Sequence, residues 1–235
     1  MALPKIQHPI FDLKIPSLNK TVKFRPFLVK EEKILLTAQS AGDKTDIITS
    51  LVQIINNCAL EDINAENLAT FDLEYLFIKL RARSVNNIIE IKYKDADDQK
   101  EYPLSIDLDK IEVKFNSENN NTVKISDSVS LKLGFPKPGM IDSLKQAANP
   151  TEVYFKILAH TLEYVIDNNV TTDVRDVKFE EVEEFIENLN IASYKEIEKF
   201  VETLPVVSHE ASYTNSKGAL KVVKLEGLED FFTLG

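Results

Sequence analysis

The stretch FDLEYLFIKLRARSVNNIIEIKY, residues 71–93, decides the fold because it is apolar on nearly every side before its periodicity changes. Two adjacent stripes at helical spacing indicate a buried helix: Leu73, Leu76, Phe77 and Leu80, beside Phe71, Tyr75, Ile78 and Ala82. Thr70 is the expected N-cap. After a turn at Asn86 and Asn87 the period becomes two, which is typical of a strand with Ile89, Ile91 and Tyr93 on one face. We therefore predict an α+β fold built around a buried central helix.

Composition favours a protein of one large domain or two small ones. The chain has 235 residues, of which 43% are hydrophobic and 28% charged, as in ordinary globular proteins. Its single cysteine, Cys58, excludes an intrachain disulfide and is expected in the core. No export or membrane signal is evident, so we expect a cytoplasmic product. The formal charge of -10 disfavours nucleic acid as a partner.

The segments before the central helix predict a hairpin and two helices. Apolar and polar residues alternate at positions 11–15 and 22–24, around turn residues, which is typical of a β-hairpin. A helix is expected from Leu28 to Gln39, and a second one from Thr45 or Asp46 to Cys58. These elements would cover the central helix.

After the central helix, alternation through residues 88–115 predicts a small antiparallel β-meander. One tip of this meander reads KDADDQKE, residues 94–101. Asp95, Asp97 and Asp98 suggest calcium, but the loop lacks the glycine and the distal glutamate of an EF-hand. We expect a solvated turn, and no metal or cofactor.

The segment GFPKPG, residues 134–139, interrupts regular structure and is the best candidate boundary. It divides the chain into an N-terminal α+β region with the meander, residues 1–134, and a mainly helical region, residues 135–235; alternatively the two form one compact unit. In the second region we expect a helix from Pro150 with a stripe reaching Val165, and a capping box of Ser193 and Glu196 for a later helix.

The chain is expected to end in a β-hairpin over residues 207–222 and a short terminal helical turn. His160 has no second ligand at metal spacing and is interpreted as a surface or satisfied core histidine. The acidic segment Glu180–Glu187 either docks a basic partner or is a solvated helix face.

Four separated motifs resemble one family. They are the opening MALPKI, RPFLVKEEKILL at residues 25–36, LEYLFIKLRARSV at residues 73–85, and LEGLEDFF at residues 225–232. Together they resemble the T4-like bacteriophage baseplate hub proteins, small proteins associated with assembly of the central hub of a contractile tail. The resemblance implies a non-enzymatic hub subunit or hub assembly chaperone that binds other hub proteins in the host cytoplasm and is either released or kept in the tail baseplate.

The binding hypothesis places partner contacts in the second and last motifs. The candidate residues are Arg25, Phe27, Lys30, Glu31, Leu225, Leu228, Phe231 and Phe232. The terminal aromatic residues need an apolar site, either in their own core or in a groove on a partner. Phosphate-binding glycine loops and a nucleophile elbow are missing from the sequence. The alternative is a small phage hydrolase or metal-dependent enzyme using Asp95, Asp97 or the Glu180 region as acids.

Overall fold

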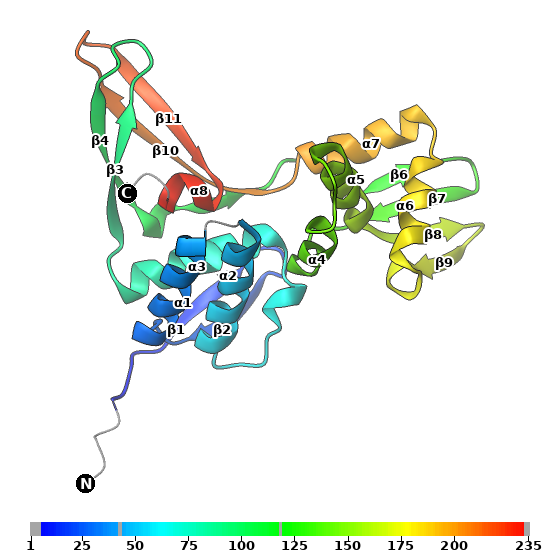
Figure 1. Cartoon of the computed structure of the whole chain (residues 1–235), viewed down its shortest axis with the longest axis horizontal. Coiled ribbons are helices and arrows are strands. Elements are labelled where there is room, and N and C mark those ends of the chain that lie inside the picture. The colour runs from blue at the N-terminus through cyan, green and yellow to red at the C-terminus, as the bar shows by residue number, and fades with distance from the viewer. Residues whose placement is uncertain (1–5, 42–43, 118, 233–235) are drawn as a thin grey trace. The chain divides into compact units, whose positions relative to one another are not determined.

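The computed structural model describes residues 6–41, 44–117 and 119–232 (Figure 1). Cα proximity divides the chain into two compact units, Met1–Lys114 with Val206–Gly235, and Phe115–Pro205. The second unit is therefore inserted into the first. The segment 134–139 lies inside the second unit, whereas the closing hairpin belongs to the first.

Among its described residues, the first unit contains four α-helices and seven β-strands, and the strands form small antiparallel sheets. In chain order they are β1 (Phe11–Ile15), β2 (Lys20–Phe24), α1 (Val29–Ala41), α2 (Lys44–Cys58), α3 (Thr70–Ser84), β3 (Ile88–Lys94), β4 (Glu101–Asp107), β5 (Glu112–Lys114), β10 (Val206–Thr214), β11 (Leu220–Glu226) and α8 (Gly227–Phe232). The predicted α+β class is confirmed, with α3 as the predicted central helix.

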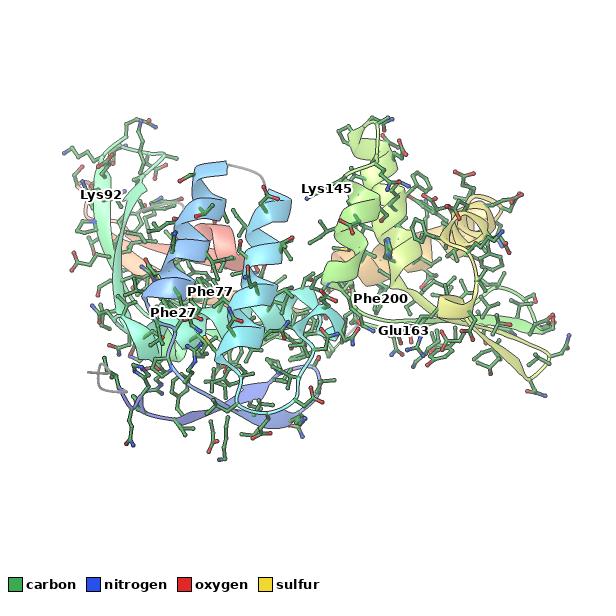
Figure 2. The ribbon with its side chains drawn as sticks, turned by 60° about the horizontal axis from the view of Figure 1, so that its bottom comes forward. Phe27, Phe77, Lys92, Lys145, Glu163 and Phe200 are labelled. Carbon is green, nitrogen blue, oxygen red and sulfur yellow. The ribbon has the colours of Figure 1, made fainter. Side chains whose placement is uncertain are left out.

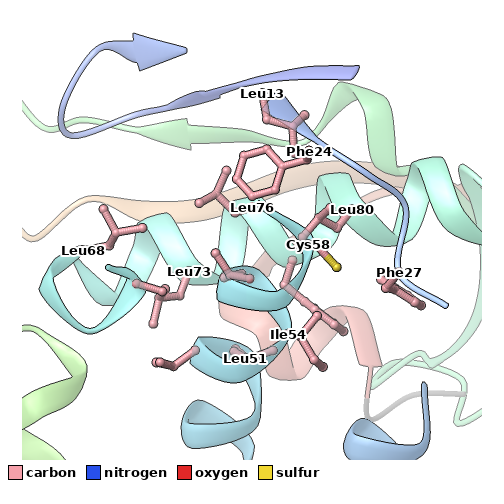
Figure 3. Packing of buried hydrophobic residues seen from close by; sticks show 14 of the residues in the cluster. Leu13, Phe24, Phe27, Leu51, Ile54, Cys58, Leu68, Leu73, Leu76 and Leu80 are labelled. Atoms are coloured by element: carbon pink, nitrogen blue, oxygen red, sulfur yellow. The ribbon is translucent and has the colours of Figure 1, made fainter. Parts of the chain in front are cut away.

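The core of the first unit forms between α2, α3 and the β1–β2 hairpin (Figure 3). Phe24, Leu76 and Ile55 are completely buried, and each such side chain contributes roughly 1.5–3 kcal/mol relative to an exposed one. The aromatic rings of Phe27 and Phe77 stack with centroids 6.1 Å apart (Figure 2). The predicted apolar stripe therefore does face inward.

The start of α3 differs from the prediction. Ala69 is the N-cap residue and Thr70 already lies within the helix. Instead, the buried Asp72 carboxylate accepts hydrogen bonds from the Ser17 backbone N–H at 2.9 Å and from Ser17 Oγ at 2.5 Å. Burial raises the pKa of Asp72 in spite of these bonds. A residue 55 positions earlier thus ties the β1–β2 turn to the helix, which local sequence rules do not reveal.

The expected meander of residues 88–115 is wrong in its pairing. β3 and β4 form a two-stranded hairpin, but β5 pairs with β10 in the three-stranded sheet β11-β10-β5. Val207 lies opposite Val113 in that sheet. The alternating pattern was correct for each strand, but alternation does not say which strand is the neighbour. As a result, the last strand before the inserted unit and the first one after it are partners.

The second unit contains a four-stranded antiparallel sheet with the order β6-β7-β8-β9 and helices packed on it. Its elements are β6 (Thr122–Lys124), β7 (Val129–Leu133), α4 (Ile141–Leu144), α5 (Pro150–Thr161), β8 (Leu162–Asp167), β9 (Val170–Asp173), α6 (Phe179–Glu187) and α7 (Ile191–Glu202). Phe135 and Phe200 stack within its core, with ring centroids 6.3 Å apart.

Two local expectations in the second unit are corrected. Val165 lies in strand β8 and not in the preceding helix, which ends at Thr161. The α7 helix is capped by Asn190, whose side chain accepts a hydrogen bond from the Ser193 backbone N–H at 2.9 Å, so Ser193 is not the cap. Val165 continued the helical stripe by coincidence of spacing, because a β-branched residue suits the strand equally well.

Candidate interaction site on helix α1

The motif at residues 25–36 divides into an inner half that anchors α1 and an outer half that faces solvent. On the inner side, the Arg25 guanidinium donates to both carboxylate oxygens of Glu31, at 3.0 and 3.2 Å. Glu31 also accepts a hydrogen bond from the Leu28 backbone N–H at 2.8 Å, although its side chain is completely buried. The carboxylate therefore satisfies a free N–H at the start of α1 and pairs with Arg25.

The ionisation of Glu31 depends on these donors. Burial alone would raise its pKa, but the hydrogen bonds from Arg25 and from the Leu28 N–H outweigh burial and hold the pKa below its ordinary value. Glu31 is consequently charged at neutral pH, and the ion pair with Arg25 is intact. This pair fixes α1 to the end of strand β2.

Phe27 and Cys58 lie behind the same ion pair. Phe27 is buried, and its backbone N–H donates to Ser84 Oγ at 2.9 Å. Cys58 is completely buried, as predicted, and burial raises the pKa of its thiol to about 11. The thiol is therefore protonated and unreactive at neutral pH. Of the four candidate residues in this motif, only Lys30 extends into solvent.

The outer half of α1 carries apolar residues that the binding hypothesis had not singled out. Val29 is 86% exposed and Leu36 is 54% exposed. Lys33 lies one turn from each of them, so the three side chains share one face of the helix. The sequence carried a signal for this face, because Val29 and Leu36 fall off the stripe that buries Glu31 and Leu35.

An open groove of about 410 Å³ runs beside this face, between α1 and α2. Its walls come from both helices, and its lining residues are Lys30, Lys33, Ile34, Thr37, Ala38, Asp46, Thr49, Ser50 and Gln53. We define the α1 face as Val29, Lys30, Lys33 and Leu36 together with this groove. It combines exposed apolar side chains, two lysines and a concave surface on a helix whose inner side is fixed.

The predicted residues of the last motif point inward. Leu225 and Phe231 are buried, the latter with 3% of its surface exposed, and Leu228 packs half-buried against the main core. The side chain of Phe232 lies outside the described residues. Helix α8 packs on α3, β10 and β11. A partner could reach Leu225 and Phe231 only if α8 moved away from the core.

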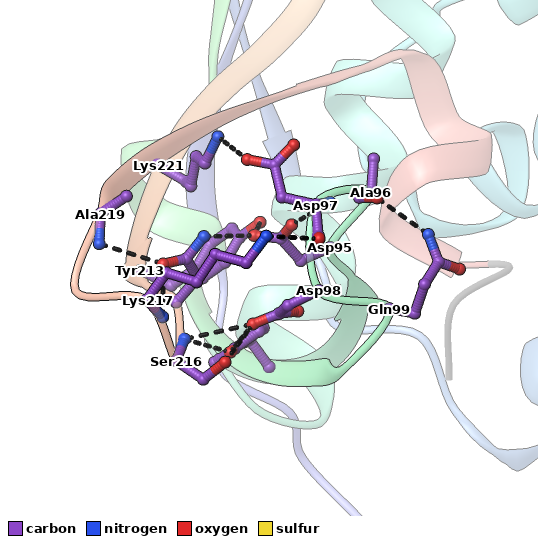
Figure 4. A network of polar contacts seen from close by, with 12 residues as sticks. Asp95, Ala96, Asp97, Asp98, Gln99, Tyr213, Ser216, Lys217, Ala219 and Lys221 are labelled. Atoms are coloured by element: carbon purple, nitrogen blue, oxygen red, sulfur yellow. Dashed lines mark hydrogen bonds and ion pairs between the residues drawn. The ribbon is translucent and has the colours of Figure 1, made fainter.

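The aspartate-rich tip between β3 and β4 is a largely exposed turn, as expected, but its aspartates also bond to a second hairpin. The β3–β4 hairpin lies beside the β10–β11 hairpin (Figure 1), and the tips of the two hairpins are joined by hydrogen bonds (Figure 4). Asp95 is buried and accepts from Tyr213 Oη at 2.8 Å and from Asn215 Nδ2 at 3.3 Å. Burial alone would raise the pKa of Asp95, but these hydrogen bonds outweigh it and keep the pKa low.

The neighbouring acids of this tip are engaged in the same way. Asp98 accepts from Tyr102 Oη at 2.5 Å and from Ser216 Oγ at 2.7 Å, and these bonds hold its pKa far below the ordinary value. Lys221 pairs with the Asp97 carboxylate at 2.5 Å. We call this set of contacts the tip clasp. Its three aspartates hold the tip of the β3–β4 hairpin against the tip of the β10–β11 hairpin, although the two tips are more than a hundred residues apart in the sequence.

Neither the acidic segment nor the histidine forms a metal centre. Across residues 6–41, 44–117 and 119–232, no group of three or more histidine, cysteine, aspartate or glutamate side chains is placed to hold a metal ion. His160 stacks on Phe179 and its Nε2 lies 2.6 Å from Ser143 Oγ, and burial lowers its pKa to about 4. It is a satisfied, partly buried histidine. On α6, Glu183 pairs with Lys156 at 2.9 Å.

These features define an α+β protein that presents an exposed apolar and basic helix face from a rigid core. The chain belongs to the T4 bacteriophage base plate protein family, because the model of that family matches residues 8–233. It is therefore a phage baseplate protein, which confirms the resemblance of the motifs within residues 8–233 to a T4-like baseplate family. Comparisons with curated proteins and with solved structures give no match. None of the helices in the described part of the chain has the length and apolarity needed to cross a bilayer.

Proposed function

We propose that this protein is a non-enzymatic component of baseplate assembly that binds other baseplate proteins through the α1 face. The observation that carries the proposal is the exposure of Val29 and Leu36 on a helix whose opposite side is fixed by the Arg25–Glu31 pair. Exposed apolar side chains that lie together and are rimmed by polar residues mark protein interaction sites. A rigid helix face loses little conformational freedom when a partner binds.

The partner class follows from the family. A baseplate protein works within an assembly of phage proteins, which supports other baseplate proteins as the binding partners. The narrower choice of hub proteins rests on the resemblance of the sequence motifs. Within this proposal the chain acts in the host cytoplasm during tail assembly, either as a hub subunit or as an assembly chaperone. The two roles differ in whether the chain is retained in the finished tail.

The hydrolase alternative receives less support from the side chains. Its candidate acids Asp95 and Asp97 belong to the tip clasp, where hydrogen bonds and an ion pair with Lys221 occupy their carboxylates. A catalytic carboxylate needs free access to a substrate in a concave site. The acids of the tip hold two hairpins together, and this supports the non-enzymatic proposal.

The test is capture of baseplate proteins from phage-infected cells, with tagged chain as bait and mass spectrometry as readout. We expect the wild type to capture baseplate proteins and the double variant V29D/L36D to lose them. Both positions are exposed, so the melting temperature should change little. The matched control is V170D, because Val170 is 67% exposed on β9 in the other unit.

Equal capture by wild type and V29D/L36D would refute binding through the α1 face. Loss of capture by V170D alone would move the interface to the second unit. Sampling purified tails for the chain then separates a retained subunit from a chaperone that leaves before completion.

A further inference from the structure

We infer that the α1 face binds an acidic amphipathic helix of its partner. The inference rests on the proposed function and adds the chemistry of the partner segment. Three properties of the described surface lead to it, namely its charge, its shape and the arrangement of its apolar residues.

The first property is a local positive charge on an acidic protein. The chain has a formal charge of -10, yet Lys30 and Lys33 line the groove and Asp46 is the single acid among its lining residues. Within the described part of the chain Lys33 makes no ion pair. Lys30 lies 3.5 Å from Glu31, but Arg25 already holds that carboxylate. Both lysines therefore keep attraction for acids on a partner, and a basic partner would be repelled.

The second property is a shape that suits a helix. The groove lies between two helices, α1 and α2, and helices offer no free backbone edge to which a strand could be added. A partner helix can lie along such a groove with side chains at i, i+3, i+4 and i+7 as anchors. The 13 residues of α1 extend about 20 Å, enough for roughly three to four turns of a partner helix.

The third property is the position of the apolar residues relative to the lysines. Ile34 and Ala38 lie in the groove, and Val29 and Leu36 lie on the other side of Lys33. A helix bound in the groove would place its apolar stripe on Ile34, and the acids along one edge of that stripe would lie near Lys30 and Lys33. An interface confined to one helix in this groove is smaller than a standard stable protein interface. The affinity of the partner helix by itself should therefore be modest.

The test is selection from a displayed library of helical peptides with random surface positions, using the full chain as the target. We expect enrichment of peptides with leucine or phenylalanine at i, i+3 or i+4 spacing, flanked by aspartate or glutamate. A synthetic copy of an enriched peptide should bind K30E/K33E about tenfold more weakly than wild type, and less tightly at high salt.

Two further variants make the result specific. K92E/K94E changes the charge by the same amount at two exposed positions of β3, of which Lys92 is labelled in Figure 2. It should alter affinity less than about twofold. If the double variant K30E/K33E unfolds, the single variant K33E replaces it in the binding assay, because it keeps Lys30 beside the buried Glu31. Selection of basic peptides, failure to enrich any peptide, or equal binding by wild type and the K30E/K33E or K33E variants would overturn the inference.

Failure here is distinguishable from failure of the proposed function. If V29D/L36D loses captured baseplate proteins while no acidic helix is selected, the binding face stands and its ligand has another chemistry. If acidic helices are selected at the α1 face but baseplate capture does not depend on Val29 and Leu36, the proposed function fails while the groove keeps its helix specificity.

Discussion

Breaking the Arg25–Glu31 pair should destabilise the first unit, and by different amounts according to which partner is removed. In Glu31→Met, the guanidinium keeps the carbonyl oxygens of Pro26 and Asn57 as acceptors, at 2.9 and 2.8 Å, and its side chain is 15% exposed. Loss of one partner of a buried pair costs about 3–5 kcal/mol. We therefore expect Glu31→Met to lower the free energy of unfolding by about 3 kcal/mol.

Arg25→Met should cost more at neutral pH. It leaves the completely buried Glu31 carboxylate with the Leu28 N–H and the more distant Lys30 ammonium, 3.5 Å away, as its remaining partners, so we expect a loss of unfolding free energy of about 4 kcal/mol. Without Arg25, burial raises the pKa of Glu31 above its unfolded value. A raised carboxyl pKa means that stability is greatest at low pH and is lost as the pH rises. The deficit of Arg25→Met should therefore shrink as the pH falls from 8 toward about 5.5.

Wild type should show no such trend over that range. Its Glu31 pKa is lowered, so the contribution of the pair is fully present above the unfolded pKa and is lost only as the pH falls below it. The double variant Arg25→Met/Glu31→Met leaves no charge unpaired and should cost less than the sum of the two single changes.

The assay is urea-dependent alkylation of Cys58, a buried thiol that reports on the first unit. Alkylation measures opening of that unit without interference from the second one. Two results would refute the idea that Arg25 and Glu31 form one buried, coupled pair. One is a loss of unfolding free energy below about 1 kcal/mol in each single variant. The other is a loss in the double variant that equals the sum of the two single losses.

Three further predictions concern other parts of the molecule. Phe231→Ala should destabilise the chain by about 3–5 kcal/mol, whereas the exposed Val222→Ala should leave unfolding nearly unchanged; an unchanged melting curve for Phe231→Ala would place that ring outside the core. The Ser216 amide donates to the Asp98 carboxylate, whose pKa is lowered. Hydrogen-exchange protection of this amide should therefore be kept above the pKa of Asp98 in the unfolded chain and be lost as the pH falls below it. Asp98→Asn should remove this pH dependence, and an unaltered profile in that variant would contradict the prediction. Replacing Phe115–Pro205 by an Asn-Gly turn should leave a folded first unit with cooperative unfolding, since Lys114 and Val206 are cross-strand partners; loss of near-UV circular dichroism would show that the inserted unit is required.

Hairpins and helices were predictable wherever a single period ran through the sequence. The closing hairpin is observed at Val206–Thr214 and Leu220–Glu226, and α2 carries the expected stripe. Helix caps were less predictable. Asn190 caps α7 in place of Ser193, which has a similar capping propensity, whereas α3 starts after Ala69, a poor capping residue, although Thr70 follows it. The choice of cap depends on where the chain enters the helix.

The tip clasp shows why part of the site escaped sequence reasoning. Asp95 and Asp98 look like loop acids in the sequence, and their donors Tyr213 and Ser216 lie more than a hundred positions away. No local pattern links them. In the α1 motif the inner role of Arg25 and Glu31 was equally hidden, since charged residues are normally assigned to the surface.

The sequence by itself determined the α+β class, the buried central helix and the family, because apolar periodicity and local motifs are properties of contiguous residues. Only the tertiary structure decided that β5 pairs with β10, that residues 115–205 form an inserted unit, and which side of α1 is free. Those features depend on contacts between distant segments, and the free energy of such contacts is a property of the packed chain and not of any one stretch.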